Sequence, residues 1–278
     1  MSVFTELAPA KINLALHVLG RRLDGYHDID SIVAFADQGD VLQFRPANVT
    51  SLTIDGPFAA GLSSGPDNLV LKAVAALQAV MPLPHFSISL TKNLPIASGI
   101  GGGSADAAAT LRGLLKLAGH ELPNHQLQEI ALSLGADVPV CLRSKPCRMQ
   151  GIGETITDLP SLPWKAIVLA NPLQPCSTTE VFRHLGLAKG QNHGTPVEWS
   201  APETWRNDLT PPALKTLPEI GSVLTTLKTR KQLQAVRMSG SGATCFGLAE
   251  STDEAENTAA HLRKACPDWW IKAAGLLR

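Results

Sequence analysis

The stretch Leu94-Pro-Ile-Ala-Ser-Gly-Ile-Gly-Gly-Gly-Ser-Ala-Asp-Ala-Ala-Ala-Thr110 decides the fold, because four glycines within residues 99–103 run directly into an alanine-rich segment. Apolar residues recur at helical spacing after the glycines, and Gly119 is typical of a helix end. Glycine allows a left-handed backbone, and a helix N-terminus directs free N–H groups toward an anion. The sequence predicts a phosphate cradle, with Ser104 as helix cap and Asp106 in the first turn.

Two familiar phosphate-binding motifs are excluded. The dinucleotide pattern G-x-G-x-x-G fails, because Ser104 stands at the sixth position counted from Gly99 and Asp106 at the sixth counted from Gly101. The P-loop fails because Gly-Lys-Ser/Thr is absent from the chain. A flexible glycine linker is the alternative, but linkers rarely lead so directly into an amphipathic helix.

Length and composition predict a globular enzyme of two domains. A chain of 278 residues exceeds the usual size of one domain, and the proline-rich passage at 158–163 suggests a boundary between residues 1–160 and 161–278. The 24 basic and 24 acidic residues cancel, which argues against a nucleic-acid partner. Five cysteines without a C-x-x-C pair favour a reducing, cytoplasmic environment, and the sequence offers no signal peptide or membrane span.

Hydrophobic periodicity predicts an α+β fold with antiparallel pairing. Strands are expected at residues 1–20, 31–35, 41–45, 51–54, 86–90, 164–170, 234–238, 243–248 and 269–274. Besides the helix after the glycines, helices are expected at 68–80, 124–134 with Asn124 as cap, 179–185, 214–229 with a break at Pro218, and 253–266. Residues 189–204 are polar and aperiodic, and we expect a loop there.

Four further features carry candidate chemistry. Lys11 and Asn13 share one face of the first strand, and Asp137 follows the helix that ends at 134. Beside a phosphate cradle, an Asp–Lys pair could serve phosphoryl transfer, although a strand lysine often reaches solvent and a turn aspartate is often solvated. Residues 239–242 form a second glycine turn, which an ordinary hairpin would also explain. Tyr26 is the only tyrosine, and it could cover a core edge or stack on a nucleobase.

Together, three ordered segments resemble the motifs of the GHMP small-molecule kinase superfamily. They are Pro9-Ala-Lys-Ile-Asn13, Pro95-x3-Gly-Ile-Gly-Gly-Gly-Ser-Ala-Asp106 and Ser239-Gly-Ser-Gly-Ala-Thr244. The resemblance implies a two-domain α+β fold with an amino-terminal domain similar to ribosomal protein S5 domain 2. It also implies a carboxy-terminal α/β sandwich and an active site in the cleft between the domains.

Within this superfamily the chain most resembles the branch that phosphorylates a cytidylyl sugar alcohol. The segments that carry this closer resemblance are Ala8-Pro-Ala-Lys-Ile-Asn-Leu14, Arg22-Leu-Asp-Gly-Tyr-His27, Gly135-Ala-Asp-Val-Pro139 and Asn207-Asp-Leu209. The implied reaction transfers the γ-phosphate of ATP, with Mg²⁺, to the 2-hydroxyl of 4-diphosphocytidyl-2-C-methyl-D-erythritol. That step belongs to the non-mevalonate route to isoprenoids.

The resemblance also assigns roles to residues of this chain. Asp137 would accept or orient the hydroxyl proton, and Lys11 would lower the pKa of that hydroxyl and keep Asp137 ionised. Substrate contacts would come from Asn13, Thr178, Tyr26 stacked on cytosine, His27 at the cytosine edge, the opposing Phe182, and Gly240 and Gly242. ATP would be bound by Pro95, Ile96, Ala97, Ser98, Gly99, Ile100, Gly101, Gly102, Gly103 and Ser104, with Asn68 near the adenine and Ser104 as the protein contact of Mg²⁺.

The sequence departs from the family pattern at one point and leaves two rival interpretations. Ala97-Ser98 stands where relatives more often have glycine or alanine at both positions, which bears on the fine geometry of the loop. A kinase of the homoserine or mevalonate type would share the glycine loop but not Asp24-Gly-Tyr-His27. An RNA-binding module is disfavoured by the balanced charge. The sequence leaves both a monomer and a homodimer open.

Overall fold

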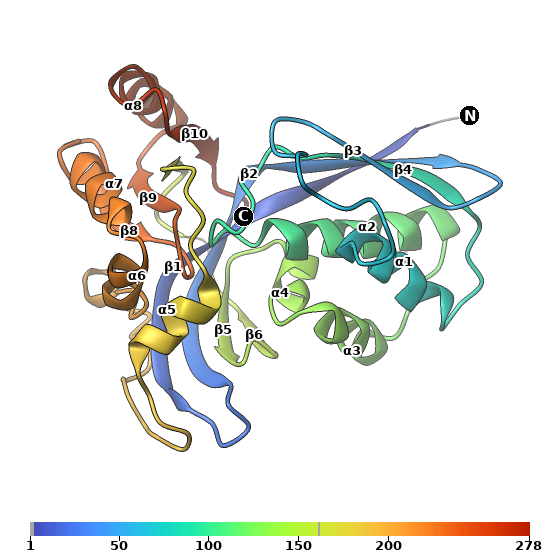
Figure 1. Cartoon of the computed structure of the whole chain (residues 1–278), viewed down its shortest axis with the longest axis horizontal. Coiled ribbons are helices and arrows are strands. Elements are labelled where there is room, and N and C mark those ends of the chain that lie inside the picture. The colour runs from blue at the N-terminus through green and yellow to red at the C-terminus, as the bar shows by residue number, and fades with distance from the viewer. Residues whose placement is uncertain (1–2, 161) are drawn as a thin grey trace. The chain divides into compact units, whose positions relative to one another are not determined.

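The computed structural model describes residues 3–160 and 162–278, which form two compact units interleaved along the chain (Figure 1). The first unit comprises the segment ending at Ala10, Gly39–Ile96 and Gly101–Arg143. The second comprises Lys11–Gln38, Ala97–Ile100 and Ser144–Arg278. The two domains expected at 1–160 and 161–278 stay a prediction. No helix among the described residues is long and apolar enough to cross a membrane.

The sheet of the first unit forms where β4 (Phe86–Thr91) lies between β3 (Ser51–Asp55) and the last part of β2 (His27–Pro46). β3 is parallel to β4 with Leu52 opposite Ile88, and β4 is antiparallel to β2 with Phe44 opposite Ile88. Burial alternates along β4, because one face of the strand lies against the core.

The two strands expected at 31–35 and 41–45 are one strand, so the predicted break between them is wrong. The strand continues through Gly39 and Asp40 because each of these residues fits its surroundings. The carboxylate of Asp40 accepts the backbone N–H groups of Asn93 and Leu94. A side chain at Gly39 would collide with the carbonyl of Ala8 at 2.0 Å, so only glycine fits there.

The helices of the first unit are α1 (Leu69–Gln78), α2 (Gly102–Ala118), α3 (Asn124–Leu134) and α4 (Val138–Arg143). α2 packs against α1 and α4. It also lies on the sheet, because a Cβ on Gly113 would sit 2.7 Å from the ring of Phe44. Short α4 was not predicted, since six residues that include Pro139 carry little periodic signal.

Two predicted helix starts in the first unit are wrong. α2 begins at Gly102, two residues before Ser104, and no side chain caps it, because Gly101 at φ 66° turns the chain directly into the helix. Asp106 therefore lies beyond the first turn and is buried. Asn124 is the first residue of α3 and Pro123 occupies the cap position, so Asn124 is not the cap.

The second unit contains an antiparallel sheet with the order β10-β7-β9-β8. These strands are β7 (Ala166–Asn171), β8 (Gln234–Met238), β9 (Cys245–Ala249) and β10 (Trp270–Gly275). Helices α7 (Glu219–Lys228) and α8 (Thr252–Ala265) pack on this sheet (Figure 1). The predicted β-β-α-β ending of the chain is confirmed, although β9 begins two residues later than expected.

Other parts of the second unit extend this core. β1 (Phe4–Arg21) contributes Leu16 and Val18 to it, and α5 (Thr178–Leu185) and α6 (Thr210–Thr216) pack on each other. The first part of β2 pairs with β5 (Cys147–Gly151), which pairs with β6 (Thr155–Asp158). β5 and β6 were not predicted. Residues 189–204 are mainly irregular, as predicted, and end in the 3₁₀ turn Pro202–Thr204.

Candidate active site

Lys11 and Asn13 lie side by side on β1, as the strand alternation predicts. They are 4% and 1% exposed, and the Lys11 ammonium donates to the Asn13 side-chain oxygen over 2.9 Å. The amide nitrogen of Asn13 donates in turn to the Ser31 hydroxyl at 2.8 Å. The backbone N–H of Lys11 donates to the carbonyl of Ile100 in the glycine loop at 3.0 Å. The second unit thus fixes a buried cation beside residues 97–100.

The second glycine turn, residues 239–242, packs against Gly99. The buried Ser239 hydroxyl donates to the Gly99 carbonyl and accepts the Asn13 backbone N–H, both at 3.0 Å. Gly99 has a φ of 76°, and a Cβ there would lie 2.4 Å from the Ser239 carbonyl oxygen. The backbone N–H of Thr244 donates to the Ser98 carbonyl. Three distant segments are therefore held together by short polar contacts.

Polar side chains of other segments form hydrogen bonds to the same turn. Asn207, buried before α6, donates from its amide nitrogen to the carbonyls of Met238 and Gly240, each at 2.8 Å. The Thr178 hydroxyl at the start of α5 is 2.7 Å from the Ser241 hydroxyl. These contacts leave the turn little freedom. The turn also joins the paired strands β8 and β9, as an ordinary hairpin would, so its role in binding a ligand stays a prediction.

The residues predicted to bind the nucleobase differ in their contacts and exposure. His27 stacks on Phe182 of α5 with ring centroids 4.6 Å apart, whereas Tyr26 is 60% exposed. Burial, helped by the nearby Arg21 charge, lowers the pKa of His27, so that its ring is neutral at pH 7. The His27 Nε2 atom is buried and makes no hydrogen bond in the structure. A neutral ring with an unused nitrogen suits recognition of a base edge.

The start of α2 in the first unit rests on a buried ionic cluster of Lys92, Asp40 and Asp106. The Lys92 ammonium donates to the Asp106 carboxylate at 2.7 Å and to the Asp40 carboxylate. A Cβ on Gly102 would lie 3.2 Å from the Lys92 nitrogen, so the cluster sits directly against the first residue of the helix.

The cluster contains one cation and two carboxylates, and its electrostatics reflect that imbalance. Burial raises the pKa of Asp106 to about 7, with Lys92 opposing the rise and Asp40 adding to it. For Lys92, burial alone would lower the pKa, but the two carboxylates raise it. The second carboxylate oxygen of Asp106 is buried without a hydrogen bond.

Three predicted site residues occupy other positions in the first unit. Asn68 caps α1: its side-chain oxygen accepts the Val70 N–H, and its amide donates to the Ser63 carbonyl. Asp137 is partly exposed and immediately precedes α4, where its carbonyl accepts the Cys141 N–H. Ser104 lies in the first turn of α2. The catalytic and adenine roles of these residues stay predictions.

The described residues offer few protein ligands for Mg²⁺. Among the described residues, no three His, Cys, Asp or Glu side chains gather as metal ligands. Mg²⁺ commonly retains waters and binds nucleotide phosphates with one or two protein oxygens. The Ser104 hydroxyl at the start of α2 fits that limited role, since Asp106 is engaged by Lys92.

Sequence reasoning missed several residues that organise the site. Lys92 and Asp40 each stand next to an apolar strand segment in the sequence. Charged residues are rarely buried unless they are paired, so this position was the one available sign that the two residues form a buried ion pair. Asn207 was part of the family resemblance but had no assigned role. Ser239 begins the third motif of the resemblance but likewise had no assigned role, because the partners of its hydroxyl, Asn13 and Gly99, are remote in the chain.

Family comparison assigns the class of protein. The family model "GHMP kinases N terminal domain" matches residues 68–145, and "GHMP kinases C terminal" matches residues 193–268, which together make up more than half of the chain. A homoserine kinase structure from Cytophaga hutchinsonii shares this fold at a TM-score of 0.70 with 15% identity. It covers 99% of this chain and 95% of its own. These matches define a GHMP-type kinase.

Relatives with higher identity define the branch. A Rhizobium etli protein named 4-diphosphocytidyl-2-C-methyl-D-erythritol kinase is 50% identical over 97% of this chain and 93% of its own length. A Paramagnetospirillum magneticum protein of the same name is 46% identical over the full length of both chains. A crystal structure of 4-(cytidine 5'-diphospho)-2C-methyl-D-erythritol kinase matches at a TM-score of 0.82 with 32% identity, covering 98% of this chain and 99% of its own. The chain therefore belongs to the 4-diphosphocytidyl-2-C-methyl-D-erythritol kinase family.

Proposed function

We propose that the protein transfers the γ-phosphate of ATP to the 2-hydroxyl of 4-diphosphocytidyl-2-C-methyl-D-erythritol. The observation that carries this proposal is the position of Lys11. Its backbone binds the glycine loop at Ile100, while its buried ammonium binds Asn13, the predicted contact of the sugar alcohol. A fixed cation is thereby available next to a hydroxyl that must lose a proton and gain a phosphoryl group.

The phosphates would be bound chiefly by backbone N–H groups of residues 95–104. Gly101 turns the chain into α2, whose first amides lack partners within the helix and so face an anion favourably. Mg²⁺ would neutralise phosphate charge when bound, with Ser104 as its protein contact. Asn68 would lie near the adenine and would have to do so while it caps α1.

The acceptor would be oriented by Asn13 and Thr178 and deprotonated by Asp137. A carboxylate base accepts the hydroxyl proton as the new O–P bond forms, while Lys11 stabilises the developing negative charge. Gly240 and Gly242 would line the substrate beside Thr178, whose hydroxyl already contacts Ser241 of the same turn.

The cytosine would be recognised by three aromatic residues. His27 would bond the base edge through Nε2, which is buried in this ring orientation and would have to turn toward the base. The exposed ring of Tyr26 would stack on the base. Phe182 holds the His27 ring by stacking and would flank the base. This arrangement supports a cytidylyl substrate over those of homoserine or mevalonate kinases. We further place the enzyme in the cytoplasm, since the sequence has five cysteines and no C-x-x-C pair, which suits a reducing compartment.

The test is ADP release from ATP and Mg²⁺ with the cytidylyl substrate, run beside mevalonate, homoserine and galactose. We expect turnover with the cytidylyl substrate alone and its loss when EDTA removes Mg²⁺. Lys11→Met should reduce kcat at least a hundredfold, whereas Lys264→Met, a change at an exposed lysine of α8, should leave it unchanged. Turnover with another alcohol instead would refute the substrate assignment.

A further inference from the structure

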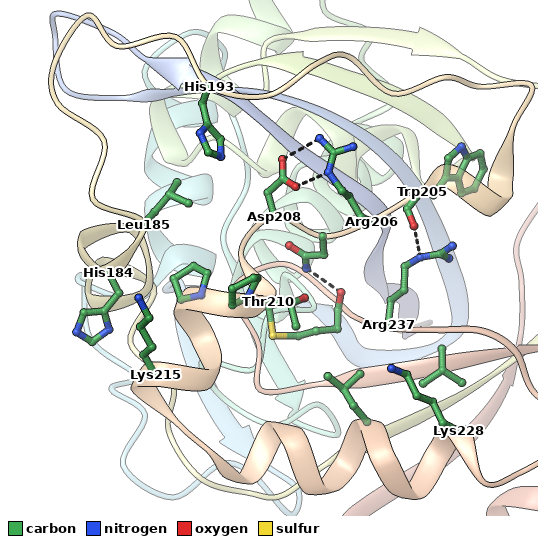
Figure 2. A pocket seen from close by; sticks show the side chains of 16 residues that line it. His184, Leu185, His193, Trp205, Arg206, Asp208, Thr210, Lys215, Lys228 and Arg237 are labelled. Carbon is green, nitrogen blue, oxygen red and sulfur yellow. Dashed lines mark hydrogen bonds and ion pairs between the residues drawn. The ribbon is translucent and has the colours of Figure 1, made fainter.

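A pocket of about 600 Å³ lies in the second unit (Figure 2), and the described residues that line it include none of those predicted to catalyse or bind substrate. Its walls come from the end of α5, from α6, α7 and β8, and from the segment that leads to α6. This volume falls within the range that small-molecule sites occupy. The pocket also borders Asn207 and Met238, which support the second glycine turn.

The pocket concentrates positive charge in a chain whose formal net charge is zero. Among the described residues that line it, four are lysine or arginine and one is acidic: Arg206, Lys215, Lys228, Arg237 and Asp208. In Figure 2 these side chains surround the open space from several sides. Asp208 is already engaged, because it binds Arg206 at 2.7 Å and accepts the Val18 N–H.

Arg237 is the strongest indication that the pocket can bind an anion. Its guanidinium donates to the carbonyls of Trp205 and Pro202, at 2.6 and 3.1 Å, and its buried Nη1 atom has no hydrogen-bond partner among the described residues. Neither Arg237 nor the two pocket lysines forms an ion pair within the described part of the chain. Burial lowers the pKa of Arg237, as expected for a cation that lacks a counter-ion. A partly buried cation without an acidic partner is unfavourable, and an anionic ligand would offset that cost.

The remaining lining is apolar and determines what else the ligand carries. Leu185, Leu224 and Val236 line the pocket together with Pro211 and Pro212. A phosphate group suits arginine and lysine because several oxygens accept their N–H donors, and an apolar substituent suits the aliphatic wall. We propose that this pocket is a second ligand site, which binds a small phosphate ester of an apolar alcohol.

The test uses n-hexyl phosphate, with inorganic phosphate and n-hexanol as the two half-ligands. Calorimetry is performed on the full chain saturated with ADP, so that a nucleotide site in the glycine loop is already filled. We expect n-hexyl phosphate to bind at least tenfold more tightly than either half-ligand, because only the whole ester reaches both the cations and the apolar wall. Equal affinity for inorganic phosphate, competition by ADP, or absence of binding would each overturn the proposal.

Variants locate the binding. Lys215 and Lys228 are exposed, so Lys215→Gln and Lys228→Gln should leave the fold intact and each weaken binding about threefold to tenfold. The matched change Lys264→Gln on α8 should have no effect, since Lys264 does not line the pocket. Arg237→Gln should abolish binding, provided that thermal unfolding shows the variant to be folded. Unchanged affinity in a variant that carries both Lys215→Gln and Lys228→Gln would refute this location.

Discussion

At the scale of single residues, the chemistry proposed here depends on a few buried or half-buried polar groups. Lys11 and Asn13 are bonded to each other within β1, and His27 is held by Phe182 with one ring nitrogen unused. Asp137 precedes α4. Each of these residues is predicted to act on a different part of the reaction, so replacement should change different kinetic constants.

Asp137→Asn should lower kcat by about 10²–10⁴, because the amide cannot accept the hydroxyl proton. KM for the acceptor should change little, since the amide has nearly the same shape. Steady-state kinetics would measure both, with Asp268→Asn at an exposed position as the control. A decrease in kcat smaller than tenfold would reduce Asp137 to a positioning group.

Phe182→Leu should raise KM for the cytidylyl substrate about tenfold to a hundredfold and change kcat less than threefold. The leucine removes both the stacking partner of His27 and a ring beside the base, and each stacked base contributes about 1–3 kcal/mol. Phe182→Tyr keeps the ring and should behave like the wild type. An unchanged KM in the leucine variant would argue against a nucleobase at this position.

Asp106→Asn should alter the pH dependence of stability. Because burial raises the pKa of Asp106 to about 7, its contribution to stability is fully present below the ordinary pKa of 3.8 and is lost as pH rises through 7. The wild type should therefore lose stability relative to the variant between pH 4 and 8, by up to about 1.4 kcal/mol per pH unit. Urea unfolding at several pH values measures this difference. Asp55→Asn, at an exposed position of β3, should instead run parallel to the wild type.

At the scale of elements, the decisive feature is the contact between the two glycine segments. One hydroxyl, that of Ser239, joins β1, the glycine loop and the second turn. The close approach requires glycine at position 99, where a Cβ would overlap the Ser239 carbonyl. The amide groups near this point are thus positioned by the second glycine turn as well as by the loop itself.

Ser239→Ala should destabilise the protein by about 1–3 kcal/mol, because it leaves the Asn13 N–H and the Gly99 carbonyl without their partner. KM for ATP should rise as the loop loses this constraint. Chemical denaturation and ATP kinetics test the two effects, with Ser222→Ala on the exposed side of α7 as the control. A Ser239→Ala protein with normal stability would show that the hydroxyl has no such role.

At the scale of the whole molecule, the two compact units share their strands. β1 passes from the first unit to the second after Ala10, and β2 passes back after Gln38. Neither unit is a continuous segment of the chain, so disorder in one removes the anchor of strands that belong to the other. We expect the units to unfold in a single cooperative transition.

Two optical probes can test this expectation, because all five tryptophans lie after Ser144 in the second unit. Tryptophan fluorescence and far-ultraviolet circular dichroism should give the same urea midpoint. Gly113→Ala would press a methyl group against Phe44 in the first unit and should shift both midpoints downward together. A fluorescence midpoint unmoved by this change would mean that the units unfold independently.

The sequence by itself determined the fold class, the glycine loop, the shared face of Lys11 and Asn13, and the closing β-β-α-β segment. Local backbone preference and hydrophobic periodicity are written in consecutive residues, and the motifs carried the family. The tertiary structure decided what depends on residues far apart in the chain. This includes the continuity of β2, the burial of Lys92 between two carboxylates and the contact of Ser239 with Gly99. It also includes the Nη1 atom of Arg237, which has no hydrogen-bond partner among the described residues. Burial and partner choice arise only when remote segments pack together, because the energy of a polar group is set by its neighbours in space.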